Sequence, residues 1–114
     1  MVQYRAAATL DRVAAAISDP TRRAIIDRLA RGPARISDVA DPFSMSLTGF
    51  CKHVRVLERA GLVRRTRRGR NKMLTLSPEP MRAVAQWVMK YEDFWNSRLD
   101  RLQNFFASRK EEPK

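Results

Sequence analysis

The sequence predicts a mainly α-helical fold with one small β-hairpin and a long C-terminal helix. Glycine occurs only at positions 32, 49, 61 and 69, which leaves long stretches free for uninterrupted helices. After position 61 the apolar pattern changes from a helical period to short strand-like runs around a single glycine. We expect a single domain over residues 1–114 with a frayed tail at 108–114.

Two helices are expected before Gly32. Apolar residues at helical spacing predict the first over residues 8–17, with Thr9 as its N-cap: Leu10, Val13, Ala14 and Ile17. The second begins at Pro20, is capped by Asp19 and ends before the glycine. Its expected buried face comprises Ala24, Ile25 and Leu29.

A helix-turn-helix is expected over residues 37–60. Ser37 caps its first helix, which is short because Pro42 removes a backbone donor. The second helix is capped by Ser46 and ends at Gly61 in a Schellman motif. Its apolar face is expected to contain Leu47, Phe50, Val54 and Leu57, and its polar and basic face Thr48, Lys52, Arg55 and Arg59.

A basic β-hairpin is expected over residues 62–76, with Gly69 in its turn. Residues 52–72 contain nine Lys or Arg and one Glu, so +8 of the net charge of +11 lies in 21 residues. A projecting hairpin lets these charges spread into solvent. Such a local excess favours an anionic partner, and nucleic acid in particular.

The long C-terminal helix is expected over residues 80–107. Its apolar residues recur at spacings close to a heptad: Val84, Val88, Tyr91, Trp95, Leu99, Leu102 and Phe106. A helix of this length spans roughly 40 Å, more than so small a domain can cover with its own core. We therefore predict a homodimer whose interface consists of this stripe together with Leu10 and Val13.

Three segments of the chain carry a resemblance to a known family: DPTRRAIIDRLA, MSLTGFCKHVRVLERAGLV and RRGRNKMLTLSPEPM. From about residue 10 to residue 102 the chain resembles the ArsR-type winged-helix repressors, and within them a metal-independent branch. The resemblance implies a winged helix-turn-helix and a dimeric transcription factor whose terminal helices form the interface. It also implies a repressor that binds an inverted repeat in double-stranded DNA.

The helix over 46–60 is then expected to enter the major groove, and the hairpin, or wing, to approach the adjacent minor groove or its phosphates. The resemblance also implies a phosphate contact by His53, although a purely structural role for this residue is open. Arg64, Arg65 and Lys72 are expected to contribute mainly a long-range field. The predicted DNA contacts are Ser46, Thr48, Gly49, Lys52, His53, Arg55, Arg67, Arg68, Arg70 and Asn71.

Cys51 has two open interpretations. As the only cysteine, it excludes a disulfide within the chain and favours a reducing cytosol. It either fills the flank of its helix as a small hydrophobic residue or acts as an oxidation-sensitive group that blocks DNA docking. The family often has serine at this position.

Several other functions are not predicted. One Cys and one His give no metal-ligand cluster, and no apolar run approaches the roughly 18 residues of a membrane helix. No phosphate-binding glycine loop or nucleophile–base motif indicates an enzyme or a cofactor, and no signal peptide contradicts a cytoplasmic location. Two alternatives stay open: a non-specific nucleic-acid-binding or architectural protein, and a module whose C-terminal helix docks on a different protein.

Overall fold

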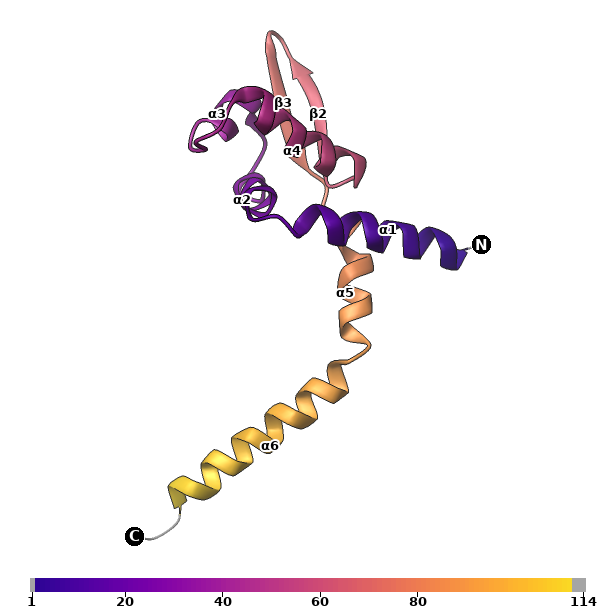
Figure 1. Ribbon diagram of the computed structural model, residues 1–114, viewed down its shortest axis with the longest axis vertical. Coiled ribbons are helices and arrows are strands. Elements are labelled where there is room, and N and C mark those ends of the chain that lie inside the picture. The colour runs from indigo at the N-terminus through magenta and orange to yellow at the C-terminus, as the bar shows by residue number, and fades with distance from the viewer. Residues whose placement is uncertain (1, 112–114) are drawn as a thin grey trace. The chain divides into compact units, whose positions relative to one another are not determined.

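The computed structural model describes the backbone of residues 2–111 and the side chains of residues 7–108 (Figure 1). The chain forms two units, Met1–Val84 and Ala85–Lys114, called here the winged unit and the C-terminal unit. The elements are α1 (Val2–Ile17), α2 (Pro20–Leu29), β1 (Ala34–Arg35), α3 (Ile36–Ala40), α4 (Leu47–Arg59), β2 (Val63–Arg68), β3 (Asn71–Leu76), α5 (Met81–Met89) and α6 (Glu92–Glu111).

The winged unit has one hydrophobic core to which α1–α4 and all three strands contribute. No polar or charged residue is buried among the described side chains, so hydrophobic burial is the main stabilising term. The core residues are Val13, Ala16, Ile25, Ile26, Leu29, Ala34, Val39, Phe50, Val54, Leu57, Ala60, Leu62, Val63 and Leu74.

The composition of this core differs from the sequence prediction at three residues. Val13 is fully buried in the chain's own interior, so its predicted place in a dimer interface is wrong. Val84 also packs against this core, although it remains partly exposed. On α2, Ala24 is exposed and Ile26 is buried, which shifts the buried face by part of a turn from the prediction.

The junction between α1 and α2 confirms one predicted cap and corrects another. The Asp19 side chain accepts a hydrogen bond of 3.0 Å from the backbone N–H of Arg22, and Pro20 occupies the first position of α2. Thr9 is not a cap, because α1 begins at Val2 and Thr9 lies within it.

The sheet has three antiparallel strands in the order β1-β3-β2 instead of the two that the sequence predicts. The additional strand, β1, pairs Ala34 with Leu74 and is only two residues long, too short to show an alternating pattern. Strands β2 and β3 form the predicted hairpin, with Arg68 opposite Asn71 across a two-residue turn. Gly69 has φ +63° in that turn, a conformation that glycine adopts without steric cost.

The helix-turn-helix consists of α3 and α4. Helix α3 is brief, as predicted from Pro42, but Ser37 lies inside it. Arg35 takes the N-cap position, where its side chain pairs with Asp38 and does not cap the helix. Helix α4 begins as predicted, because Ser46 Oγ accepts a hydrogen bond from the backbone N–H of Gly49 at 3.1 Å.

The predicted Schellman motif ends α4. The N–H of Leu62 donates to the carbonyl of Leu57 at 2.9 Å, and the N–H of Gly61 donates to the carbonyl of Glu58 at 2.9 Å. Gly61 has φ +76°, as this ending requires. The motif fixes the direction in which the chain leaves α4 and enters β2.

The C-terminal helix is interrupted, which corrects the prediction of one continuous helix over 80–107. The N–H groups of Lys90 and Tyr91 donate to the carbonyls three residues earlier, at 3.3 and 3.1 Å, which makes a tight turn between α5 and α6. Neither glycine nor proline marks this break in the sequence. Helix α6 continues to Glu111, past the predicted end, and residues 112–114 of the predicted frayed tail lie outside the described residues.

Candidate nucleic-acid interface

Helix α4 presents two chemically different faces. Phe50, Val54 and Leu57 are at most 1% exposed and anchor the helix to the core. The residues predicted to contact DNA lie on the other side: Ser46, Thr48, Lys52 and Arg55 are exposed and Gly49 is partly exposed. The helix is therefore held by one face and offers the other to solvent. This is what the prediction of a reading helix, a helix that enters the major groove, requires.

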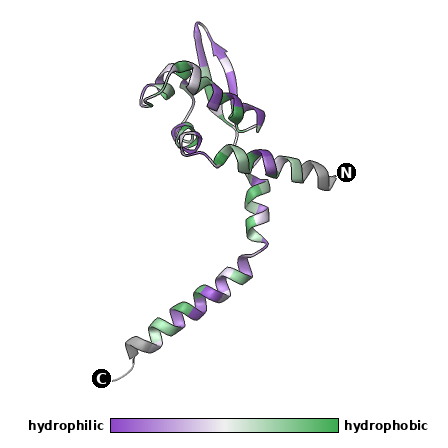
Figure 2. Cartoon of the chain, in the orientation of Figure 1, coloured by the Kyte–Doolittle hydropathy of each residue, from purple (hydrophilic) through white to green (hydrophobic). Residues whose placement is uncertain are grey.

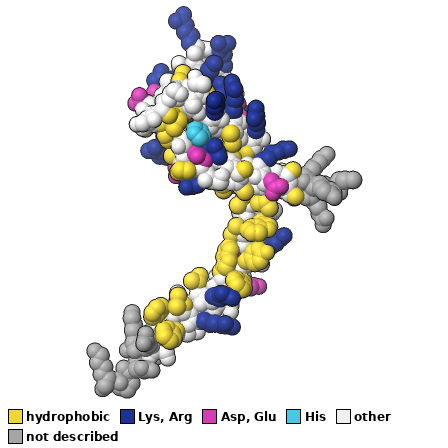
Figure 3. All heavy atoms as spheres, in the orientation of Figure 1, with side chains coloured by type: hydrophobic (Ala, Val, Ile, Leu, Met, Phe, Trp, Pro, Cys, Tyr) yellow, Lys and Arg dark blue, Asp and Glu magenta, His cyan; other side chains and the backbone are white. Residues whose placement is uncertain are grey.

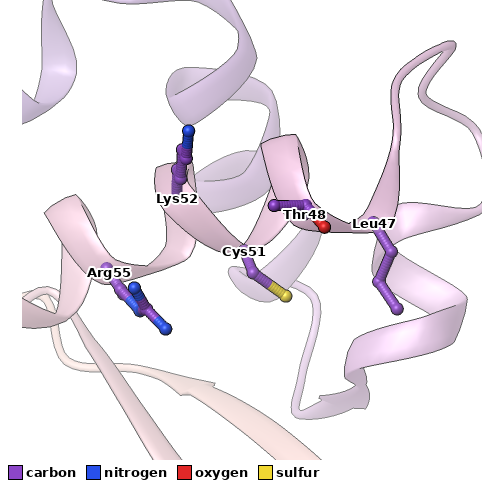
Figure 4. A pocket seen from close by; sticks show the side chains of 5 residues that line it. All are labelled: Leu47, Thr48, Cys51, Lys52 and Arg55. Carbon is purple, nitrogen blue, oxygen red and sulfur yellow. The ribbon is translucent and has the colours of Figure 1, made fainter.

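The predicted apolar face of α4 is wrong at Leu47, whose side chain is 60% exposed. Leu47 is the first residue of α4, and the core covers the helix only from Phe50 onward. With Thr48, Cys51, Lys52 and Arg55 it lines a shallow depression on the free face of α4 (Figure 4). Met45, in the preceding loop, is 38% exposed as well. The helical period places Leu47 on the same face as the core residues. The one sequence signal for its exposure is its position directly after the N-cap Ser46, at the end of the helix.

Gly49 lies beside the side chain that caps α4. A Cβ built at this position would lie 3.3 Å from Ser46 Oγ, the atom that caps α4. This is a tight contact, but the cap does not need glycine, because a capping box has Glu or Gln at this same position. A contact between Gly49 and DNA remains a prediction.

His53 belongs to a polar joint between α1, α2 and α4. Its Nδ1 lies 3.2 Å from Arg22 Nη1 and 3.8 Å from Asp19 Oδ2. A guanidinium can only donate, so in this pair Nδ1 accepts and the ring proton of neutral His53 is on Nε2. His53 thus has a structural role, and the phosphate contact that the resemblance implies remains a prediction that would use Nε2.

The arginines of the DPTRR segment close the end of α1. Arg22 Nε and Nη2 donate to the carbonyls of Ala16 and Ala15 at 2.6 and 3.1 Å, and Arg23 Nη1 donates to the carbonyl of Ile17 at 2.8 Å. The arginine side chains therefore act as a C-cap for α1, together with Ser18, whose backbone N–H and hydroxyl also donate to the carbonyl of Ala15. Part of the chain's positive charge is therefore structural.

Asp19 is the acidic member of this joint. The pKa of its carboxyl is lowered from the usual value, mainly by the hydrogen bond from the Arg22 backbone N–H. Burial opposes this shift, and the positive charge of Arg22 adds to it. The ionised form of Asp19 is therefore the one that caps α2.

The residues of the wing that are predicted to contact DNA or to contribute charge are exposed. Arg67, Arg68, Arg70, Asn71 and Lys72 are all exposed. Figure 2 shows the hairpin as strongly hydrophilic, and Figure 3 shows Lys and Arg side chains gathered on the winged unit, including its hairpin end. Such a surface attracts a polyanion.

Arg65 is different from its neighbours. Its Nη2 lies 2.8 Å from Glu58 Oε1, and both side chains are about one third exposed. The pair connects β2 to α4, so Arg65 holds the wing beside α4 instead of contributing only to the long-range electrostatic field. Arg65 Nε is buried and has no hydrogen-bond partner among the described residues.

Two negative findings apply to the described part of the chain. Within it, no group of three or more Cys, His, Asp and Glu side chains is placed to hold a metal ion. None of its helices combines the length and apolar character needed to cross a membrane. Cys51 is partly exposed in the depression on α4, where either of its two interpretations remains open.

Comparisons with known proteins agree with this geometry. Residues 17–66 match the sequence model of a protein family described as a helix-turn-helix domain. The transcriptional repressor SdpR of Bacillus subtilis is 29% identical over 82 residues, which cover 72% of this chain and 91% of SdpR.

Two solved structures are also similar to this chain. The crystal structure of the ArsR family transcriptional regulator RHA00566 is 40% identical, with a TM-score of 0.71 and coverage of 78% of this chain and 92% of that one. The homodimeric winged helix-turn-helix DNA-binding domain of Mb0332 from Mycobacterium bovis, a possible ArsR-family regulator, is 25% identical, with a TM-score of 0.64 and coverage of 79% and 86%. This chain belongs to the ArsR family of winged helix-turn-helix transcriptional regulators.

Proposed function

We propose that this protein is a homodimeric, sequence-specific DNA-binding repressor that acts in the cytoplasm on an inverted-repeat operator. It needs no metal or cofactor for this and has no enzymatic activity. Helix α4 occupies the major groove, and the wing lies over the neighbouring minor groove or its phosphates. Membership of the ArsR family and similarity to the transcriptional repressor SdpR support the assignment as a repressor.

The observation that carries the proposal is the shared exposure of α4 and the wing on one unit. The solvent-facing side of α4 and its N-cap offer Ser46, Thr48, Lys52 and Arg55, and the outer part of the β2–β3 hairpin offers Arg67, Arg68, Arg70 and Asn71. The Schellman ending of α4 and the Arg65–Glu58 pair fix the wing relative to that helix. A rigid cationic frame of this kind can address a groove and its flanking phosphates together.

The second copy is proposed from the C-terminal unit. Its large apolar side chains are 39–56% exposed, including Tyr91, Trp95, Leu99, Leu102 and Phe106 of the predicted stripe. Val88 and, on α1, Leu10 remain in the proposed interface. The homodimeric Mb0332 domain supports a two-fold assembly. Its two reading helices are expected about one helical turn of DNA apart, ~34 Å.

A salt titration tests the electrostatic part of this proposal. If the dimer neutralises about eight phosphates, the logarithm of the association constant falls with log salt at a slope near −7. Fluorescence anisotropy with a duplex selected from a random library measures it. A slope near zero contradicts the proposed phosphate contacts.

Two matched substitutions separate base reading from phosphate binding. Lys52→Ala is expected to reduce the preference for the selected duplex over a scrambled one. Arg68→Ala is expected to weaken binding to both duplexes equally, because a phosphate contact carries no sequence information. If the parent protein binds both duplexes with one affinity, it is the non-specific nucleic-acid-binding protein that the sequence left open.

A further inference from the structure

The leading turn of α4 carries an apolar surface that the fold itself does not use. Leu47 is 60% exposed and Met45 is 38% exposed, whereas every other Leu, Ile and Met side chain that the structure describes in the winged unit is buried or partly buried. Both residues belong to the segment that the proposed function brings to the base edges. Because the core does not use these two neighbouring side chains, they are free to contribute to binding at this point.

The neighbours of Leu47 are of a different kind. Figure 4 shows Leu47, Cys51 and Arg55 pointing to one side of α4, while Lys52 leaves the helix in another direction. The cations lie one and two turns along the helix from Leu47, and its own end of the depression carries no charge. The uncharged end of the depression can therefore pack on an apolar group of a base, at a position separate from the bases or phosphates that Lys52 and Arg55 reach.

Base chemistry restricts what an aliphatic side chain can recognise in the major groove. Guanine, adenine and cytosine present hydrogen-bonding groups there, whereas thymine adds a C5 methyl group. A leucine against a polar base edge removes water from that edge without returning a hydrogen bond. Against a thymine methyl it buries apolar surface on both sides.

We propose that Leu47, supported by Met45, selects a thymine in each half-site by packing on its C5 methyl group. This inference rests on the proposed function, since it requires α4 in the major groove. It adds a named base and a named specificity residue. The expected operator therefore has a thymine at the position that faces the first turn of each reading helix.

Replacement of thymine by deoxyuridine tests this directly, because the two bases differ only in the methyl group. The probe is the duplex most enriched from a random 30-base-pair library. Its thymines are replaced one at a time and then in symmetry-related pairs. For the parent protein, we expect replacement of the thymine that faces Leu47 in one half-site to weaken binding about fourfold. Replacement of the equivalent thymines in both half-sites should weaken it about fifteenfold. Other replacements should have little effect.

Two variants assign that effect. Leu47→Ala should bind thymine and deoxyuridine duplexes with equal affinity, and circular dichroism should show that it folds, because the side chain is exposed. Lys52→Ala should bind more weakly but keep the ratio between the two duplexes. A parent protein that is indifferent to every replacement overturns the proposal whether or not the variants fold, as does an unchanged ratio in Leu47→Ala.

The design separates this inference from the proposed function. Enrichment of a particular sequence without a deoxyuridine effect, or of a sequence without thymine, retains sequence-specific binding and rejects the role of Leu47. If no sequence is enriched, both proposals are wrong.

Discussion

The two units of this chain use similar apolar residues in opposite ways. In the winged unit such residues converge from seven helices and strands into one interior, and Phe50 is 1% exposed. In the C-terminal unit no described side chain is buried, and Phe94 is 51% exposed. The apolar content of a segment therefore does not reveal whether it stabilises its own fold or a complex. The order of a unit without buried residues should depend on association.

Truncating a phenylalanine in each unit should give the largest contrast. Phe50→Ala is expected to lower the free energy of unfolding by about 3–5 kcal/mol, because it opens a cavity in the core. Phe94→Ala should leave the unfolding of the winged unit unchanged. Urea denaturation followed by circular dichroism at low protein concentration compares them, and equal losses would break the distinction between the units.

Substitution in the stripe of the C-terminal unit should act on association. Trp95→Ala is expected to weaken the dimer about 30-fold, the effect of losing an aromatic side chain that contributes about 2 kcal/mol to an interface. Sedimentation equilibrium measures the dissociation constant. Asn104→Ala, on the opposite side of the same helix, is the control, and equal dimerisation of both variants would remove Trp95 from the interface.

Within the winged unit, the Arg65–Glu58 pair should make a smaller contribution. Glu58→Ala is expected to cost about 1 kcal/mol, since it leaves a half-buried guanidinium without its partner. Glu79→Ala removes the same charge from an exposed site. Thermal unfolding should rank Glu58→Ala below both Glu79→Ala and the parent, and the reverse order would argue against the pair.

The smallest expected effect is a pH dependence from Asp19. Folding lowers the pKa of this carboxyl, so its contribution to stability is complete above its unfolded pKa of about 4 and is lost as the pH falls through the lower folded value. Asp19→Asn keeps a good N-cap but does not titrate. Urea midpoints between pH 5 and pH 2 should therefore fall less in Asp19→Asn than in the parent, and parallel curves would contradict the assignment.

Local chemistry explains which parts of the fold could be predicted from the sequence. The Asp19 and Ser46 caps, the Schellman ending at Gly61 and the Gly69 turn each depend on a few adjacent residues, and all four are confirmed. Strand β1 exists only because β3 lies beside it, so its own two residues carry no signal. The break at Lys90 is also invisible to a heptad pattern, which describes a face and not the backbone.

The candidate site divides in the same way. Exposure of the cations on α4 and the wing could be predicted from helical and strand periods. The partner of Arg65 and the position of His53 depend on contacts between elements, and the exposure of Leu47 depends on where the core stops. Periodicity therefore locates a face, and only tertiary structure shows how far that face extends.

The guanidinium of Arg22 changes how an alanine scan of this protein should be interpreted. It joins the last turn of α1 to the ring of His53 on α4, so its removal would loosen the support of the reading helix without deleting any contact to a ligand. In a protein with 23 Lys and Arg, a binding defect at this position could easily be credited to lost charge. The salt dependence of the variant distinguishes the two causes, because a purely mechanical defect leaves the number of released counterions unchanged.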